Sequence, residues 1–420
     1  MALKCIFVVD MKKVLIIGFV WVEPNSSAAG SRMMQLIELF QNNGYQVNFA
    51  TTASPSNFSD DLEINNIITQ KIELNSNTFD EYITELKPDI VLFDRFMVEE
   101  QFGWRVTKSC PKALKILDTE DLYCLRKTRQ EAFKKSIKFD FSYLKQADIT
   151  KREIASIYRC DLSLIISTYE INLLQDEFKI DSRILYYVPF LIHKLEKEDS
   201  QKLPKFKERQ HFVSIGNFLH EPNYNMVLYL KETIWPLIKK QLPKAHLHVY
   251  GAYSSQKVQQ LHNEKEGFLI KGRAGSVAEV MQKGKVCLAP IRFGAGIKGK
   301  FIDAMQNGLP SITTSLGAEG MQHGKEWGGY IENEPEQFAK QAVAVYNNQE
   351  LWETAQQNGF ELLNAVYDKN IYEQSFISLL EMLQDNLKTH RTQNFVGTML
   401  QHHTMQSTKY LSKWIEAKNK

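Results

Sequence analysis

One pattern runs through the chain twice: short, largely apolar runs alternate with helical stretches. In the first series the runs lie at residues 14–20, 45–51, 89–94, 114–121, 160–168 and 184–190. In the second they lie at residues 211–218, 245–251, 267–272, 286–290 and 311–314. Apolar strands separated by helices predict parallel sheets that are covered on both faces. We therefore expect an α/β fold built from two Rossmann-like sheets.

The stretch between the two series, residues 194–210, is charged and nearly free of core residues, which marks a domain boundary. We expect an N-terminal domain at residues 11–193, a linker at 194–210, a C-terminal domain at 211–375, and a C-terminal helix and basic tail at 376–420. Helices between residues 335 and 384 are expected to complete the second half. Ligands of open parallel sheets lie beyond the carboxyl ends of the strands. Two facing sheets therefore favour transfer of a group between two bound molecules.

The composition excludes several classes of function. A net charge of +2 gives no electrostatic basis for binding nucleic acid. The five cysteines are scattered without a CxxC pair, which argues against a disulfide framework or a zinc site and fits a reducing compartment. The apolar run VLIIGFVWV has about nine residues, too few to span a bilayer. We therefore expect a cytoplasmic protein, with residues 1–10 as a dispensable extension.

Residues 286–321 carry the strongest functional signal. A buried strand, VCLAP, leads into a glycine-rich turn with Lys298, then a helix, a second strand and another glycine-rich turn, SLGAEG. Backbone amides and a helix N-terminus at such a junction attract a diphosphate. Lys298 is expected either to neutralise that diphosphate or to be a solvated turn lysine. Asp303 is expected either to accept hydrogen bonds from ribose hydroxyls or only to complement the helix dipole.

This segment resembles the donor-binding signature of family 4 ("group 1") retaining glycosyltransferases, which have the GT-B fold of two facing Rossmann-like domains. The resemblance extends forward through SLGAEG at residues 315–320. It also extends back to the G-x-x-x-x-x-P-N pattern at residues 216–223, near the start of the second half. The family's first conserved Glu falls on Ala295 here, and no His precedes His193 to match the family's N-terminal one. The matching motif residues are Gly294, Gly296, Lys298, Asp303, Ala304, Met305, Gly308 and Pro310.

The resemblance implies that a nucleoside diphosphate sugar binds the C-terminal domain, without a metal or a separate cofactor. Lys298 would hold the diphosphate, helped by Arg292 or Arg273, and Asp303 would bind the ribose. Gly272 and Arg273 would face the base. The remaining donor-binding residues would be Gly216, Asn217, Gly294, Gly296, Gly317, Glu319 and Gly320.

Candidates in the N-terminal half follow predicted strands. Asp118 and Asp121 are expected to orient acceptor and sugar hydroxyls, ionised by an ion pair with Arg126. The alternative is a capping box, in which Asp118 or the next residue starts a helix. Asp94 ends the neighbouring strand, where it could act at the site or form only an ion pair with the arginine that follows.

Gly30 and Arg32 lie in the loop after the first strand, which approaches the diphosphate and acceptor in GT-B enzymes. Arg32 is expected either to add positive charge there or to be exposed in the first turn of a helix.

The resemblance thus implies a hexosyltransferase that moves a sugar from a nucleoside diphosphate to an acceptor hydroxyl of a sugar, glycan or lipid-linked molecule, by front-face substitution with retention. Two alternatives stay open: a GT-B sugar-nucleotide epimerase, and a protein that binds a sugar nucleotide or polysaccharide without turnover.

Residues 386–420 carry six Lys or Arg against one Glu, beside Tyr410, Leu411 and Trp414. This tail is expected either to contact the inner membrane face or to be a solvated helix.

Overall fold

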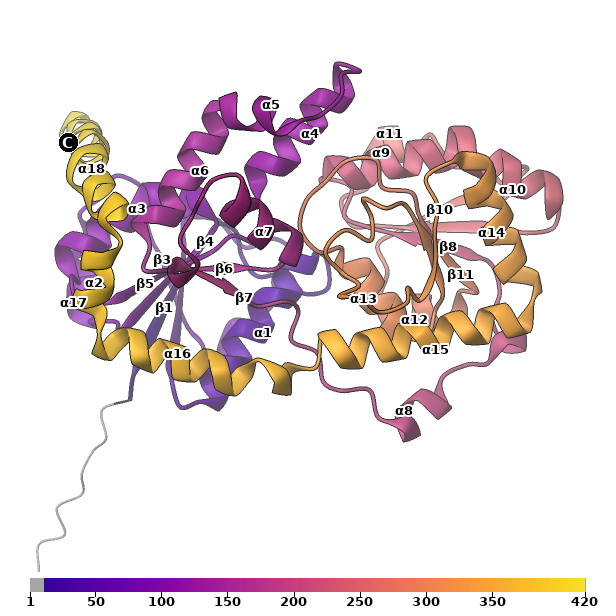
Figure 1. The fold of residues 1–420 in the computed structure, drawn as a ribbon, viewed down its shortest axis with the longest axis horizontal. Helices are drawn as coiled ribbons and strands as arrows, with labels where there is room; N and C mark the ends of the chain where they lie inside the picture. Colours follow the sequence, from indigo (N-terminus) through magenta and orange to yellow (C-terminus); the bar gives the residue numbers. More distant parts are fainter. Residues whose placement is uncertain (1–10, 420) are drawn as a thin grey trace, which may run out of the picture.

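The computed structural model describes residues 11–419, apart from the side chains of residues 403–405. Two parallel sheets lie side by side in two lobes, each with helices on both faces (Figure 1). The α/β architecture of two Rossmann-like sheets is therefore confirmed. Among the described residues, no helix combines the length and the hydropathy that crossing a bilayer requires.

The N-terminal sheet has seven strands in the order β3-β2-β1-β4-β5-β6-β7, all paired in parallel. Its central strands are buried on both faces, which is why their sequences are apolar throughout. The strands are β1 (Lys13–Gly18), β2 (Gln46–Thr51), β3 (Ile68–Lys71), β4 (Ile90–Asp94), β5 (Leu114–Asp118), β6 (Leu162–Ile165) and β7 (Leu185–Tyr187). The helices are α1 (Ala28–Asn42), α2 (Thr78–Leu86), α3 (Phe96–Ser109), α4 (Tyr123–Lys134), α5 (Phe141–Gln146), α6 (Asp148–Arg159) and α7 (Thr168–Asp176).

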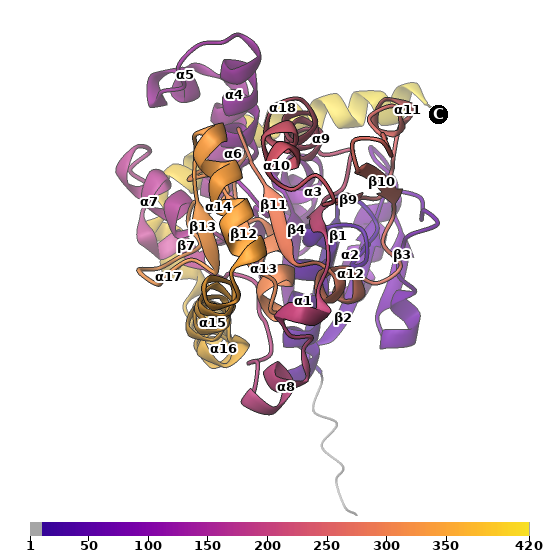
Figure 2. The ribbon, with the colours of Figure 1, turned by 90° about the vertical axis from the view of Figure 1, so that its right-hand side faces the viewer.

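The C-terminal sheet has six parallel strands in the order β10-β9-β8-β11-β12-β13, which Figure 2 shows from one edge to the other. A short helix in the linker, α8 (Lys197–Lys202), precedes it. The strands are β8 (Phe212–Ile215), β9 (Leu247–Tyr250), β10 (Phe268–Gly272), β11 (Val286–Ala289), β12 (Ser311–Thr313) and β13 (Gly329–Ile331). The helices are α9 (Glu221–Tyr229), α10 (Trp235–Gln241), α11 (Gln256–Gln259), α12 (Val277–Lys283), α13 (Gly299–Gln306), α14 (Pro335–Asn347) and α15 (Gln349–Val366).

The end of the chain returns to the N-terminal lobe, as the yellow helices in Figure 1 show. Helix α16 (Glu373–Asp385) buries Phe376 and Leu380 in the N-terminal core, and Phe376 stacks on Tyr186 of β7. Helices α17 (Leu387–Gln393) and α18 (Phe395–Lys418) follow, and Arg391 binds Asp161 on the same lobe. The expectation that helices up to residue 384 complete the second half is therefore wrong for α16.

Three further details differ from the sequence expectations. The stretch 126–156 has a helical pattern in its sequence, but it is divided among α4, α5 and α6 because a turn precedes Asp140, which caps α5. The edge strands β3 and β13 are four and three residues long and lack a buried apolar pattern, so no strand is predicted there. Helix α7 was also not expected, and it supplies a residue of the candidate site described below.

Candidate active site between the two sheets

The glycine-rich segment after β11 reaches the N-terminus of α13, as the sequence predicts. Lys298 is the residue before the first turn of α13, and Lys300 is the second residue of the helix. The Lys298 ammonium donates to the carbonyl oxygen of Gly296 at 2.9 Å. The Lys300 ammonium donates to Asn223 Oδ1 at 2.8 Å. Two cations therefore flank a helix end whose free amides already favour an anion.

Both ammonium groups are poor in negative partners. Among the described residues, neither Lys298 nor Lys300 lies within ion-pair distance of a carboxylate. Burial lowers the pKa of Lys298 to about 8, although more distant carboxylates such as Glu319 oppose the shift. Burial also lowers the pKa of Lys300 to about 8, and Lys298 adds to this by repulsion. An anion bound between the two would relieve both effects.

Asp303 lies one turn further along α13. Burial raises its pKa to about 7, and among the described residues no hydrogen bond to its carboxylate oxygens is recorded. Gly272, at the end of β10, has a φ of +71°, and a Cβ built there would meet nothing within 4 Å. The carboxyl end of β10 is thus open at Gly272, and its base-facing role stays a prediction.

The N-terminal lobe presents two neighbouring strand ends to this loop. Asp94 and Asp118 are register partners at the ends of β4 and β5. Each is followed closely by a residue in the left-handed region, Arg95 with φ 72° and Glu120 with φ 60°. Such conformations are uncommon for residues other than glycine and cluster at functional sites. Burial and then the charge of Asp118 raise the pKa of Glu120 well above its ordinary value.

Arg32 does not add charge to the donor side. Its guanidinium is completely buried and donates to the carbonyl oxygen of Pro189 at 2.8 Å and to Asp118 Oδ1 at 3.2 Å. Both expectations for Arg32 are therefore wrong, and so is the pairing of Asp118 with Arg126. Among the described residues, Asp94 Oδ1 and Asp118 Oδ2 are buried without a hydrogen-bond partner. Buried acceptors of this kind suit hydroxyl donors of a substrate.

Asp121 does pair with Arg126, as expected, at 2.6 Å. Burial opposes ionisation of Asp121, but the charge and hydrogen bond of Arg126 outweigh it and hold its pKa below the ordinary value. The capping alternative is wrong, because α4 begins only at Tyr123 and no side chain of its own segment caps it. Glu153 accepts from its first amides instead.

Two side chains of the N-terminal lobe hold the loop that carries Lys298. Arg129, on α4, donates to the Gly294 carbonyl at 2.9 Å and to both carboxylate oxygens of Glu319 at 2.7 and 2.9 Å. Glu170, on α7, accepts from the amide of Gly296 at 2.7 Å. Burial, with a contribution from a neighbouring aspartate, raises the pKa of Glu170 to about 8. The two lobes are thus joined by polar contacts at the predicted donor loops.

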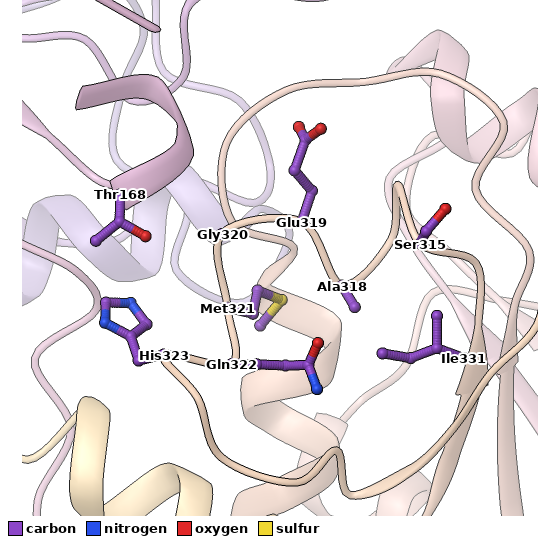
Figure 3. A pocket seen from close by; sticks show the side chains of 9 residues that line it. All are labelled: Thr168, Ser315, Ala318, Glu319, Gly320, Met321, Gln322, His323 and Ile331. Carbon is purple, nitrogen blue, oxygen red and sulfur yellow. The ribbon is translucent and has the colours of Figure 1, made fainter. Parts of the chain in front are cut away.

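The contact between the lobes is close at Gly296, where φ is +64° and a Cβ would lie 2.7 Å from the Cβ of Asp121. A cavity of about 290 Å³ lies beside this contact. Figure 3 shows Thr168 of α7 facing the loop that carries Glu319, Gly320 and His323. Glu319 and Gly320 were expected in the donor site and line this cavity, whereas Lys298 and Asp303 do not.

Several other expected donor residues are engaged in packing between or within the lobes. Asn217 donates to the carbonyl of Ser26 at 3.3 Å, across the lobes. Arg273 lies over the ring of Phe58, 4.6 Å from its centre. Arg292 is held by Asn225 and lies between two aromatic rings, so its guanidinium already has partners. The glycines Gly30, Gly216, Gly317 and Gly320 each lie where a Cβ would come within 3 Å of a neighbouring residue.

Sequence reasoning missed Lys300, Glu170 and Arg129. The second lysine of GIKGK was a signal for Lys300, because it stands at the same helix start as Lys298. Glu170 and Arg129 have no local signal, since both act on residues more than 120 positions away.

The comparisons with known proteins agree with this geometry. Residues 209–348 match the family model of "Glycosyl transferases group 1". An uncharacterised 44.6 kDa protein of the cps region of Klebsiella pneumoniae is 22% identical over 301 residues, which are 68% of this chain and 74% of that protein.

Solved structures share the fold at low identity. Staphylococcus aureus TarM, in complex with UDP and α-GlcNAc-glycerol, is similar with a TM-score of 0.66 and 12% identity, over 88% of this chain and 100% of TarM. Anabaena HepE, in complex with UDP and glucose, is similar with a TM-score of 0.63 and 11% identity, over 88% of this chain and 99% of HepE. Residues 209–348 are therefore similar to group 1 glycosyltransferases, and the chain has the GT-B fold.

Proposed function

We propose that the diphosphate of the sugar donor binds at the N-terminus of α13, between the ammonium groups of Lys298 and Lys300. One observation carries this proposal: a partly buried and a buried lysine share a helix start, and among the described residues neither has a carboxylate partner. Buried charges are costly unless they are compensated. A diphosphate would supply that compensation and would also accept hydrogen bonds from the first amides of the helix.

The other groups then take separate roles. Asp303 binds the ribose hydroxyls, and the base lies beyond Gly272 at the end of β10. The acceptor hydroxyl approaches from the ends of β4 and β5, where, within the described part of the chain, Asp118 presents a buried oxygen without a hydrogen-bond partner and Asp94 Oδ1 forms only an ion pair, at 3.6 Å from Arg95 Nε. The charge that develops on the leaving diphosphate is held by the two lysines, and that diphosphate takes the acceptor proton. Catalysis would be electrostatic and positional, with retention of the anomeric configuration.

We propose a uridine nucleotide as the donor carrier, because TarM and HepE, which share the fold, were both solved with UDP. The test is incubation with UDP-glucose, UDP-GlcNAc and the GDP-linked sugars, with release of nucleoside diphosphate and the anomeric proton of the product followed by NMR. We expect slow hydrolysis of one UDP-sugar, and an α-configured product from an α-linked donor once an acceptor is present. Saturable binding without hydrolysis or transfer would instead support a non-catalytic protein.

The pKa values of the site predict how UDP affinity depends on pH. The Asp303 carboxyl, with a pKa of about 7, must be ionised to accept strongly from ribose hydroxyls, so affinity should fall below pH 7. The ammonium of Lys298 or Lys300, with a pKa of about 8, must be protonated, so affinity should also fall above pH 8. Calorimetric titration of UDP should therefore give the smallest Kd between those two values.

Asp303→Asn isolates the acidic side of this profile. At pH 8 the variant should bind UDP about tenfold or more weakly, since hydrogen bonds to charged groups contribute about 1.5–3 kcal/mol. At pH 6, where the wild-type carboxyl is protonated, the two proteins should bind UDP alike. Glu279→Gln, on an exposed face of α12, is the matched control and should follow the wild type. A constant ratio of the two Kd values across this pH range would remove Asp303 from the ribose site.

The cytoplasmic location and a peripheral membrane contact stay proposals. Helix α18 leaves large apolar side chains exposed beside Lys409 and Lys413, which suits an anionic lipid surface. These side chains are Phe395, Met399, Tyr410, Leu411 and Trp414. Sedimentation with anionic vesicles tests the contact, and equal recovery with and without vesicles would rule it out.

A further inference from the structure

Three histidines lie together at the amino-terminal ends of two strands of the C-terminal sheet, on the side opposite the candidate active site. His211 precedes β8, His246 precedes β9, and His248 lies within β9. The active-site loops follow the carboxyl ends of these parallel strands. The histidines, at the amino ends, therefore lie on the opposite side of the sheet. Sugar transfer uses none of the three.

Strand register explains why the rings meet. Phe212 pairs with Leu247 and Val213 with His248. Because side chains alternate between the faces of a sheet, His246 and His248 project from one face, and His211, opposite His246, projects from the same face. The backbone of His211 is fixed there, because its carbonyl accepts from the amide of Lys285 at 2.9 Å.

The geometry of the rings is close to that of a ligand set. One nitrogen from each histidine lies within 4.8 Å of those of the other two. The His211 ring centre is 4.4 Å from that of His248 and 5.3 Å from that of His246. A tetrahedral ion with Zn–N bonds of about 2.0–2.1 Å needs nitrogens about 3.3 Å apart. Side-chain rotation on two fixed strands can supply that difference.

The three rings are also available as ligands. Each is partly buried, and among the described residues no hydrogen bond to any of these imidazoles is recorded. A neutral imidazole without another partner can bind a metal ion through a ring nitrogen.

We propose that His211, His246 and His248 bind one divalent transition-metal ion, with Zn²⁺ as the first candidate, at the amino-terminal ends of β8 and β9. Three neutral nitrogen ligands without a carboxylate suit Zn²⁺, Cu²⁺ or Ni²⁺ rather than Mg²⁺ or Ca²⁺. Three protein ligands leave a fourth position for water or an exogenous ligand. The scattered cysteines predict no zinc site, and this one uses none of them. By joining β8 to β9, the ion would stabilise the donor-binding lobe at a distance from the chemistry.

The test is titration of the untagged full chain with ZnCl₂ by calorimetry, with Co²⁺ in a parallel optical titration. We expect a micromolar Kd, the visible absorption of four-coordinate Co²⁺, and a higher unfolding temperature with Zn²⁺. His248→Ala and His246→Asn should each weaken binding at least tenfold and abolish the thermal shift.

His193→Ala is the matched control, because His193 is exposed just before the linker and lies outside the cluster. It should bind Zn²⁺ like the wild type. Unchanged unfolding temperatures of the variants without metal show that the variants fold. The proposal would be overturned if the wild type bound zinc with the same stoichiometry as His248→Ala and no more tightly than that variant.

Discussion

Lys298→Ala is expected to lower kcat about 10²–10³-fold, the usual effect of removing one positioned electrostatic group from a transition state. The ammonium lies at the start of α13, where the leaving diphosphate gains its charge in the proposed reaction. Partial burial makes it more effective, because water screens it less than a fully exposed charge, and burial also lowers its pKa to about 8. The loss should appear mainly in kcat, since Lys300 and the helix amides still bind the ground-state diphosphate.

The experiment needs a lysine that changes charge without touching the site. Lys283→Ala serves this purpose, since its side chain is exposed and, within residues 11–419, its one ion pair is with Glu279 on the same helix. Steady-state kinetics with saturating donor should separate the two variants by at least tenfold in kcat. Circular dichroism and the unfolding temperature establish that Lys298→Ala folds. Near-wild-type turnover in a folded variant would remove Lys298 from the mechanism.

The parts of the site that the sequence predicts are local in the chain. Gly296, Lys298 and Asp303 lie within eight consecutive positions, so a strand, a glycine turn and a helix start bring them together whatever the rest of the fold does. The two sheets were equally predictable, because strands covered on both faces must be apolar throughout. Pairing of Asp121 with Arg126 also follows from nearness in the chain.

The parts that the sequence does not predict depend on distant packing. Arg32 resembles an exposed first-turn residue, yet α1 buries it against β5, where Asp118 and a carbonyl accept hydrogen bonds from its two terminal guanidinium nitrogens. Helix α16 continues the helical pattern of α14 and α15, and nothing in its amphipathic face specifies which lobe it will cover. Likewise, Arg129 and Glu319 are separated by 190 positions, and only the relative placement of the two lobes makes them partners.

That pair leads to the second large effect: Arg129→Leu is expected to open the two lobes and lower kcat/KM about tenfold to 100-fold. The guanidinium holds Glu319, the Gly294 carbonyl and the hydroxyl of Tyr169, so one side chain fixes both donor loops to α4. Removing one partner of a buried ion pair costs about 3–5 kcal/mol, because the other charge is left uncompensated. Because 17% of the Glu319 side chain is exposed, we expect a free-energy cost toward the lower end of that range.

Small-angle scattering of the donor-free protein should therefore show a larger radius of gyration for Arg129→Leu than for the wild type. The double variant Arg129→Leu/Glu319→Gln removes both charges, so no buried charge is left unpaired. Its radius of gyration should therefore be closer to the wild-type value than the radius of Arg129→Leu is. Arg152→Leu, which breaks a solvent-exposed pair with Glu100, is the matched control. If Arg129→Leu keeps the wild-type radius and turnover, the ion pair does not hold the lobes together, and closure must rest on other contacts between them, such as those of Glu170 with Gly296 and of Asn217 with Ser26.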